Sequence, residues 1–307
     1  MQNRLLLLLF ILFMFACAHL KDARQAYNQK DYQRTIRLCR AHIKQDSTDA
    51  DALLLLSRTY LNLDSADQSL HILFRVKTLE NRSKQQNTAL SDQLRRHASK
   101  TNNRSEAIAL LMEAESADSL NRSVLDTLAT LLISQNEFQK AKERLYRLAD
   151  LSQDPLSCLN RINLIENRQA FAVSEYEQGM AALKSGHKEK AENHLKKAAD
   201  ADPGFSEAVF QYGLLAGNRL YRKGSQDALS EAIGILRAAV HVRPDNIEAV
   251  FLLAKTLERK GQDTLGDAIE YYGRALKLAP NGKYARTCRN KIEKLEKRKA
   301  FWEKGKN

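Results

Sequence analysis

The chain has 307 residues, of which 43% are hydrophobic and four are proline, and it lacks segments in which apolar and polar residues alternate. This composition allows a large buried core and excludes a β-rich fold, so we expect an almost entirely helical protein. Lysine and arginine outnumber aspartate and glutamate by 49 to 37, which gives a formal net charge of +12. A basic balance of this kind is typical of proteins that bind nucleic acid or membranes.

The N-terminal segment decides between these two partners. An apolar run of eleven residues, Leu5 to Phe15, ends at Ala16 and Cys17. The run is too short to cross a bilayer of about 30 Å but has the length of a signal-peptide core. Ala16 and Cys17 resemble the bacterial lipoprotein box, which implies a signal peptide over residues 1–16 and a lipid such as palmitate on Cys17. The two residues before Ala16 depart from that box, so plain signal cleavage or an uncleaved anchor stays open. Each alternative predicts an exported protein and excludes nucleic acid as a partner.

The segment after the cysteine is predicted to form short amphipathic helices from Leu20 onward. The helical pattern weakens near Leu79, and residues 81–87 are polar enough to predict a mobile loop. Residues 154–171 predict an extra helix with Pro155 in its first turn. We expect that helix to divide the chain and to be the place where it bends.

The clearest repeating unit runs from Ala172 to Pro203 and consists of two predicted helices separated by Gly186. Small residues at fixed positions let the two backbones approach closely, because a bulky side chain there would cost about 1 to 3 kcal/mol. The same spacing of a small, a large apolar and a second small residue recurs along the chain: Ala107, Leu111 and Ala114; Ala191, Leu195 and Ala198; Ala232, Leu236 and Ala239; Ala268, Tyr272 and Ala275. Weaker copies bring the number of units to seven.

These positions resemble the tetratricopeptide repeat, a helix-turn-helix unit of about 34 residues. The resemblance implies an all-α superhelix, an α-α solenoid, of about seven repeats with a capping helix at the C-terminus. An accidental helical bundle is the alternative. We predict the following division: a signal peptide over residues 1–16, repeats one to four over 17–153, an extra linking helix over 154–171, repeats five to seven over 172–282, and a basic capping helix and tail over 283–307.

No pattern of catalytic or metal-binding residues stands out in the sequence. Cys39, Cys158 and Cys288 are more than a hundred residues apart and predict neither a disulfide nor a metal site. Cys39 falls at the large core position of the first repeat and is expected to be a small buried hydrophobic residue. His187 and His194 are expected to be surface histidines. Phosphate-binding glycine loops, nucleophile elbows and zinc helices are missing. We therefore predict that the protein is not an enzyme and uses no cofactor and no metal.

The resemblance also implies where a partner would bind, because the first helix of each repeat lines the concave groove in that family. The residues at the inward positions are Arg24, Tyr27, Leu54, Arg58, Leu61, Arg96, Tyr176, Met180, Leu215, Phe251 and Lys255. Arg24, Arg58 and Arg96 would form a row, and guanidinium groups bind carboxylates in a bidentate way. The row predicts an acidic or carboxylate-bearing protein segment as the ligand, and solvated arginines on a helix face are the alternative.

Strings of Asp followed by Ser or Thr and an apolar residue resemble the O-glycosylation sequence of one group of Gram-negative bacteria. The candidate positions in predicted turns are Ser47, Ser65, Ser119 and Thr264. Asp, Ser and Thr also cap helices and form turns, which produces similar strings for structural reasons. Both interpretations stay open.

Trp302, the only tryptophan, lies in the basic C-terminal tail. One interpretation is a side chain that folds back on the last repeat. The other is a basic and aromatic tail that touches a membrane surface.

Together these features predict a non-catalytic, membrane-anchored scaffold for protein–protein interaction in the bacterial cell envelope. We expect an outer-membrane lipoprotein, with its periplasmic or surface face left open. A first alternative is an assembly factor of outer-membrane proteins, similar to the repeat lipoproteins of the β-barrel insertion machinery. A second alternative is an accessory subunit of an enzyme that acts on glycans or peptidoglycan.

Overall fold

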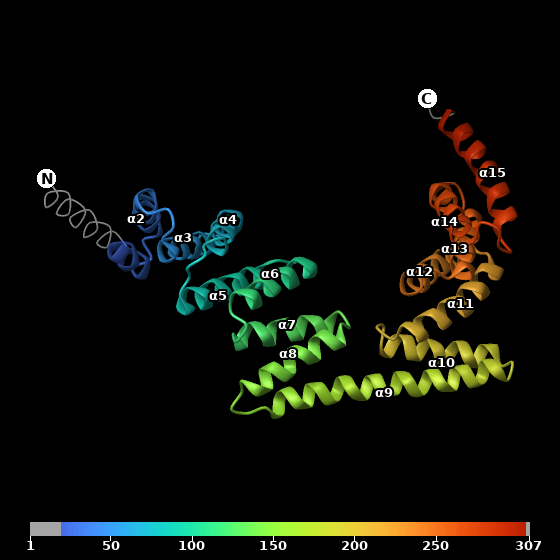
Figure 1. Cartoon of the computed structure of the whole chain (residues 1–307), viewed down its shortest axis with the longest axis horizontal. Helices are drawn as coiled ribbons and strands as arrows, with labels where there is room; N and C mark the ends of the chain where they lie inside the picture. Colours follow the sequence, from blue (N-terminus) through green and yellow to red (C-terminus); the bar gives the residue numbers. More distant parts are fainter. Residues whose placement is uncertain (1–19, 305–307) are drawn as a thin grey trace. The chain divides into compact units, whose positions relative to one another are not determined.

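The structure is a computed structural model that describes residues 20–304. Every regular element in that part of the chain is a helix, which confirms the prediction of an all-α fold (Figure 1). The chain divides into two compact units. Unit 1 ends at Ile162, and unit 2 begins at Asn163. Cys17 and the predicted signal peptide lie outside the described residues.

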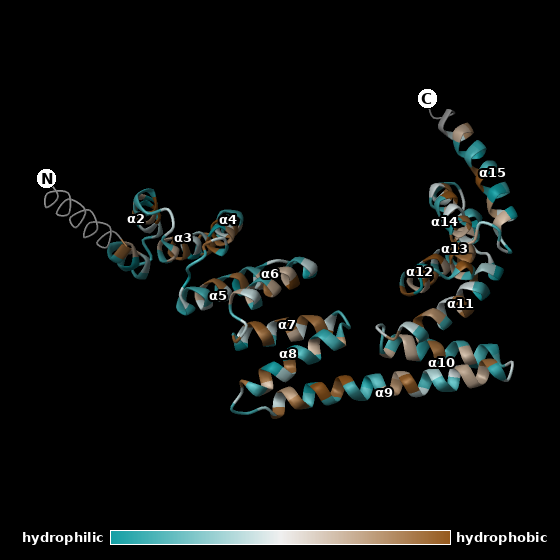
Figure 2. Cartoon of the chain, viewed as in Figure 1, coloured by the Kyte–Doolittle hydropathy of each residue, from teal (hydrophilic) through white to brown (hydrophobic). Residues whose placement is uncertain are grey.

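The helices follow one another in helix-turn-helix pairs, and hydrophobic and hydrophilic residues alternate along them, as expected of helices with one buried face (Figure 2). Residues 20–28 are helical. The remaining elements of unit 1 are α2 (Tyr32–Gln45), α3 (Ala50–Asn62), α4 (Ala66–Lys77), α5 (Lys84–Lys100), α6 (Arg104–Ala117), α7 (Arg122–Ser134) and α8 (Phe138–Asp150). Helix α9 (Leu156–Lys184) begins in unit 1 and continues into unit 2. Unit 2 adds α10 (Lys188–Ala201), α11 (Ser206–Lys223), α12 (Gln226–Val242), α13 (Ile247–Lys260), η1 (Gln262–Thr264), α14 (Leu265–Leu278) and α15 (Ala285–Lys304).

Four of the turns inside these pairs share one backbone geometry. Lys30, Asp64, Asn136 and Gly186 have φ angles of 60°, 54°, 59° and 78°. In each turn the next residue donates its N–H to the carbonyl five positions earlier, at 2.9 to 3.0 Å, which is the long hydrogen bond of the Schellman motif. Three of the four positions hold a side chain in a left-handed conformation that glycine adopts more easily. The recurring turn is therefore a structural repeat that the glycine content does not reveal.

Helix α5 begins at Lys84, so the predicted mobile loop over residues 81–87 is wrong for its second half. Ser83 forms a capping box with Gln86: the Ser83 Oγ accepts from the Gln86 N–H at 3.2 Å, and the Gln86 Oε1 accepts from the Ser83 N–H at 2.9 Å. Two N–H groups that a helix N-terminus leaves unpaired are satisfied in this way. The loop was predicted from polar composition alone, without regard to the Ser-x-x-Gln pattern that caps this helix.

The packing of α5 on α3 and α4 relies on polar side chains. The Ser57 and Ser69 hydroxyls lie 2.8 Å apart in the interior, and the His97 Nε2 lies 2.8 Å from the Ser69 Oγ. The Gln93 Nε2 donates to the Leu54 carbonyl oxygen at 3.0 Å. These hydrogen bonds satisfy buried polar groups that would otherwise destabilise the fold.

A second polar contact joins α6 and α8. Glu115 is buried, and it accepts hydrogen bonds from Arg144 at 3.1 Å and from Arg147. Arg147 also donates to the Ser119 carbonyl oxygen at the end of α6. Two guanidinium groups thus hold one buried carboxylate, an arrangement that becomes costly if a partner is removed.

Helix α9 combines two elements that the sequence predicted separately. Its first turns place Cys158 in a cluster with Leu125 and Leu148 of the preceding pair. Its last turns place Gly179 against Leu195 of α10. The extra helix and the first helix of the fifth repeat are therefore one continuous helix of 29 residues, and the prediction of a separate linking helix over 154–171 is wrong. No glycine or proline interrupts the segment between these two packing regions, so nothing in the backbone ends the helix there.

Unit 2 packs its helix pairs through small residues. A Cβ added at Gly179 would lie 2.8 Å from the Leu195 side chain, and one added at Gly217 would lie 2.6 Å from the Leu236 side chain. Gly217 in α11 thus corresponds to Gly179 in α9, because each contacts the large apolar residue of its partner helix. The residue after Gly217 is Asn218, so the assignment of Leu215 as the equivalent of Met180 is wrong by three positions.

The last helix covers the end of unit 2, as predicted. Cys288 and Leu295 of α15 are buried in the same apolar cluster as Tyr272 and Leu253. Beyond Leu295 the described side chains of α15 are exposed. The interpretation in which Trp302 folds back on the last repeat is therefore wrong.

Candidate functional site

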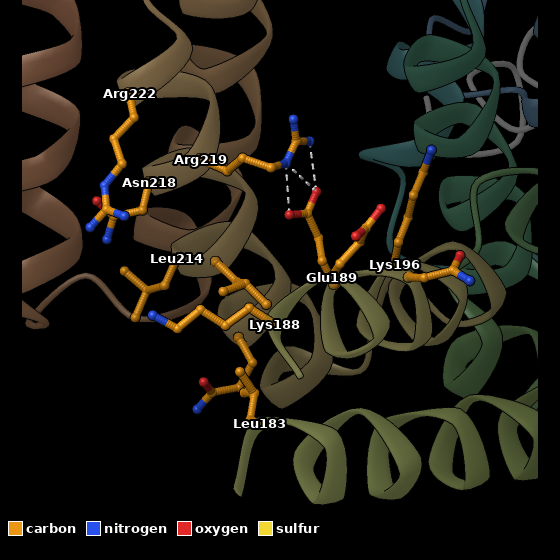
Figure 3. Close-up of a pocket in the computed structure, with 12 residues that line it drawn as sticks. Leu183, Lys188, Glu189, Lys196, Leu214, Asn218, Arg219 and Arg222 are labelled. Atoms are coloured by element: carbon orange, nitrogen blue, oxygen red, sulfur yellow. Dashed lines mark hydrogen bonds and ion pairs between the residues drawn. The ribbon is translucent and has the colours of Figure 1, made fainter. Parts of the chain in front are cut away.

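The larger pocket of unit 2 lies on the end of α9 and on α10 and α11 (Figure 3). Its volume is about 800 Å³, which is within the range of ligand sites in proteins. The residues that line it are Leu183, Lys188, Glu189, Glu192, Asn193, Lys196, Gln211, Leu214, Leu215, Asn218, Arg219 and Arg222. We call it the α10–α11 pocket.

The α10–α11 pocket has more positive than negative side chains. Its four cations face two glutamates, and one cation is already bound: Arg219 makes three hydrogen bonds of 2.7 to 3.0 Å with Glu192, drawn as dashed lines in Figure 3. These bonds raise the pKa of Arg219 above its ordinary value. Among the described residues, no carboxylate lies within ion-pair distance of Lys188, Lys196 or Arg222. Three cations of the pocket are therefore available to an anionic ligand.

The uncharged side chains of the pocket suit an extended peptide. Asn193, Gln211 and Asn218 carry amide groups, which both donate and accept hydrogen bonds and so match the N–H and C=O groups of a backbone. Leu183 and Leu214 add apolar surface to the same lining, and Figure 3 shows Leu214 close to Asn218. The combination can bind main chain, apolar side chain and acidic side chain at the same time.

A second pocket of unit 2, about 390 Å³ in volume, lies on α11, α13, α14 and α15. It brings together two residues that the sequence predicted for the groove, Phe251 and Lys255. The Lys255 Nζ lies 4.7 Å from the centre of the Tyr221 ring and 5.8 Å from that of Phe251. Such cation–π contacts hold a charged group above an aromatic surface.

The wall of this second pocket contains one carboxylate, Glu258. The Tyr272 hydroxyl donates to it at 2.6 Å, and the Lys291 Nζ lies 2.5 Å from its other oxygen. Burial, together with this hydrogen bond, raises the pKa of Tyr272 above its ordinary value. The carboxylate is thus committed to internal partners, while Arg259 and Arg298 add positive charge to the lining.

The predicted arginine row of unit 1 is only partly available for a ligand. Arg24 forms an ion pair of 2.6 Å with Asp51, and the Arg58 guanidinium lies 5.2 Å from the centre of the Tyr27 ring. The Tyr27 hydroxyl in turn accepts from the Asn62 side chain at 2.8 Å. Arg96 is exposed. Asp51 therefore neutralises one charge of the row, and Tyr27 and Arg58 do lie together as predicted.

Two predicted groove leucines do not reach the surface. Leu54 and Leu61 are 5% and 3% exposed, and α5 covers them through hydrogen bonds from Gln93 and Lys100 to their carbonyl oxygens. The groove assignment of these leucines is therefore wrong.

The two groove residues predicted on α9 lie outside the lining of the α10–α11 pocket. Tyr176 packs edge-on against Phe205 at 5.0 Å, and Met180 is half-buried. The sequence missed Asn193, Gln211 and Asn218, although Gly217 is a signal that could have set the register of α11.

The described residues contain no group of three or more His, Cys, Asp or Glu side chains that could hold a metal ion. Cys39, Cys158 and Cys288 are free and buried, and for Cys39 this burial confirms the prediction. Burial, with a smaller contribution from Asp49, raises the pKa of Cys39 to about 12, which keeps this thiol protonated and a poor nucleophile. Within the described part of the chain, no helix has the length and apolar content needed to cross a membrane.

The prediction of two surface histidines holds for one of them. His187 is exposed, but His194 is half-buried and its Nδ1 lies 2.8 Å from the buried carboxylate of Glu175. The helix face of His194 was assigned to solvent because the buried glutamate on α9 was not anticipated.

The four candidate glycosylation positions differ in exposure. Ser47 and Ser119 are exposed, whereas Ser65 and Thr264 are half-buried. The Thr264 hydroxyl also donates to the Leu257 carbonyl oxygen at 2.6 Å. Modification stays a prediction, and Ser47 and Ser119 are the sites with room for a sugar.

The comparisons with known proteins match part of the chain. Residues 176–220 and 217–283, both in unit 2, match the family model described as tetratricopeptide repeat. Human protein O-mannosyl-transferase TMTC1 is 24% identical over 193 residues, which are 63% of this chain. The chain spans about a fifth of that relative, since the match covers 20% of it.

Similar solved structures share little sequence with the chain. YrrB, described as a TPR protein with an unusual peptide-binding site, is 15% identical and aligns over 82% of this chain and 97% of its own, with a TM-score of 0.31. The TPR2AB-domain:pHSP90 complex of yeast Sti1 is 12% identical over 92% of this chain and 99% of its own, with a TM-score of 0.37.

Proposed function

We propose that this chain, which is a tetratricopeptide-repeat protein, is a non-catalytic scaffold that binds an acidic segment of a partner protein in the α10–α11 pocket. The observation that carries the proposal is the composition of that pocket. Lys188, Lys196 and Arg222 have no carboxylate partner among residues 20–304, and amide and leucine side chains line the same surface. An acidic peptide in extended conformation would satisfy all three kinds of side chain.

The proposal moves the binding region from unit 1, where the sequence placed it, to unit 2. In unit 1 the charge of Arg24 is already balanced by Asp51, and Arg58 already lies on Tyr27. In unit 2 the Arg219–Glu192 pair leaves the other cations of the pocket unpaired. An anionic ligand should therefore bind more favourably to Lys188, Lys196 and Arg222 than to the arginines of unit 1, because no internal carboxylate has to be displaced first.

Two matched triple variants test the choice between these regions. Lys188→Gln, Lys196→Gln and Arg222→Gln together are expected to weaken capture of the partner and to flatten its salt dependence, since exposed charges are screened by salt. Arg24→Gln, Arg58→Gln and Arg96→Gln remove the same charge from unit 1 and are expected to have a smaller effect. Capture of the cross-linked partner from intact cells is the measurement. A larger loss with the unit 1 set would contradict the proposal.

The scaffold is further proposed to be a lipoprotein of the bacterial outer membrane, anchored through Cys17. The support is the apolar run that ends at Ala16 and Cys17 in the sequence. Cys17→Ala should release the protein from the membrane fraction and abolish its labelling by a clickable palmitate. Labelling that persists in this variant would contradict the anchor but not the peptide-binding proposal.

A further inference from the structure

The end of α15 differs from the first part of that helix in the exposure of its described side chains. Cys288 and Leu295 fix the first part of the helix in the apolar cluster. From Glu296 to Trp302 every side chain is exposed. Figure 1 shows α15 running from the last repeat to the C-terminal end of the chain. We call residues 296–302 the α15 tip.

The α15 tip carries two large aromatic side chains in contact with solvent. Phe301 is 78% exposed and Trp302 is 49% exposed. In Figure 2 an apolar segment interrupts the hydrophilic colours of α15 close to its end. Exposed aromatic area of this kind is unfavourable in water, and adjacent exposed aromatics usually have a partner that removes them from it.

The side chains around this aromatic pair are mainly cationic. The sequence from residue 283 to the end has ten lysines and arginines and three glutamates. Lys294 and Lys297 are exposed on the turns that precede the aromatic pair, and the Lys297 ion pair with Glu293 has side chains that are 75% and 70% exposed. Long cationic side chains around an aromatic pair are typical of segments that lie at a membrane surface, where the rings enter the headgroup region and the charges stay in water.

We propose that the α15 tip docks on an anionic phospholipid surface, with Phe301 and Trp302 in the interfacial layer and the lysines at the headgroups. Charge complementarity favours an anionic lipid surface as the partner, because a basic helix end is attracted to an anionic leaflet. A soft interface also accepts two aromatic rings without a shaped cavity. Neither of the two pockets described above includes Phe301 or Trp302 in its lining. The contact is independent of the peptide-binding proposal and of a lipid on Cys17.

The sequence offers a direct probe of this contact, since Trp302 is the only tryptophan in the chain. Its fluorescence reports on the α15 tip even if another part of the protein also touches the vesicle. The full-length protein is mixed with vesicles of phosphatidylcholine alone or of phosphatidylcholine with phosphatidylglycerol. Anionic vesicles are expected to shift the emission to the blue and to allow quenching by brominated lipid, whereas neutral vesicles are expected to leave it nearly unchanged.

Two variants separate charge from aromatic insertion. Lys294→Gln with Lys297→Gln should reduce the blue shift at a given vesicle concentration, and the loss should resemble that caused by added salt. Phe301→Ser should reduce the shift without changing its salt dependence. All three positions are exposed, so circular dichroism should show unchanged helix content. An emission spectrum that anionic vesicles leave unchanged, or one that only an acidic protein partner shifts, would overturn the proposal.

Discussion

The interiors of the two units share buried alanine and leucine but differ in some of the contacts that join their helices. In unit 1 polar side chains join successive helices, as in the Ser57, Ser69 and His97 network and in the Glu115 site. In unit 2 the equivalent contacts are glycine against leucine, as in Gly179 with Leu195 and Gly217 with Leu236. Directional hydrogen bonds thus add to the apolar packing of helix pairs in unit 1, whereas close contacts at glycine distinguish the pairs of unit 2.

The segments that the family model matches, residues 176–220 and 217–283, lie in unit 2. A repeat pattern records positions where only a small residue fits, and close packing makes those positions strict. Hydrogen-bonded contacts accept other residue types at the same positions, so the pattern fades while the fold remains. Substitutions in the two units should therefore lower the free energy of unfolding through the loss of different interactions.

The largest effect is expected from the buried carboxylate of unit 1. Glu115→Ala leaves Arg144, whose side chain is 17% exposed, without its buried carboxylate partner. Removing one member of a buried ion pair costs about 3 to 5 kcal/mol, and the partial exposure of this site favours the lower end of that range.

Glu143→Ala is the matched control for that variant, since Glu143 binds the same arginine at 2.8 Å but its side chain is 67% exposed. Its cost should be about 0 to 1 kcal/mol. Denaturant unfolding measures both variants, and equal losses would contradict the role assigned to Glu115.

An intermediate effect is expected from the close packing of unit 2. A Cβ at Gly213 would lie 2.5 Å from the Ala239 Cβ, so Gly213→Ala should destabilise the protein by about 1 to 3 kcal/mol. Gly234→Ala adds the same methyl group to the neighbouring helix at a position with no atom within 4 Å. That control should be neutral or stabilising by up to about 1 kcal/mol through helix propensity. A stabilising Gly213→Ala would show that the helices can move apart freely.

The smallest effect concerns the pH dependence of unit 1. Burial, with a smaller contribution from Lys100, lowers the pKa of His97 from its ordinary 6.5. The unfolded chain therefore binds a proton near pH 6.5 that the folded chain excludes. The stability due to neutral His97 is fully present above that pH and falls as the pH drops through it toward the lower folded pKa.

His97→Gln should make stability less sensitive to a change from about pH 7.5 to about pH 5.5. Denaturant midpoints at the two pH values measure the effect. His241→Gln, at an exposed position of unit 2, is the control and should behave as the parent does. An identical pH response of the His97 variant and the parent would contradict the assignment.

Much of the fold follows from the sequence, and the binding surface follows only in part. Small residues such as Ala191 and Ala239 identify the helix pairs because a buried contact restricts volume, and both are fully buried. The residues that line the groove could not be predicted as reliably as the helix pairs. Leu54 and Leu61 were assigned to it because a sequence position gives the face of one helix but not the neighbour that covers it. The shift from Leu215 to Asn218 has a different cause, because the contact that sets the register of α11 is that of Gly217 with Leu236.

The most direct test of the account is to find where a partner segment lies. A photoreactive amino acid replaces Asn218 in the α10–α11 pocket or, as a control, Gly234 on the exposed side of α12. Illumination in intact cells followed by mass spectrometry identifies the attached peptide. We expect an acidic segment to be attached at position 218 and this attachment to disappear at high salt. No attachment is expected at position 234. Equal attachment at both positions, or a segment without acidic residues at position 218, would contradict the account.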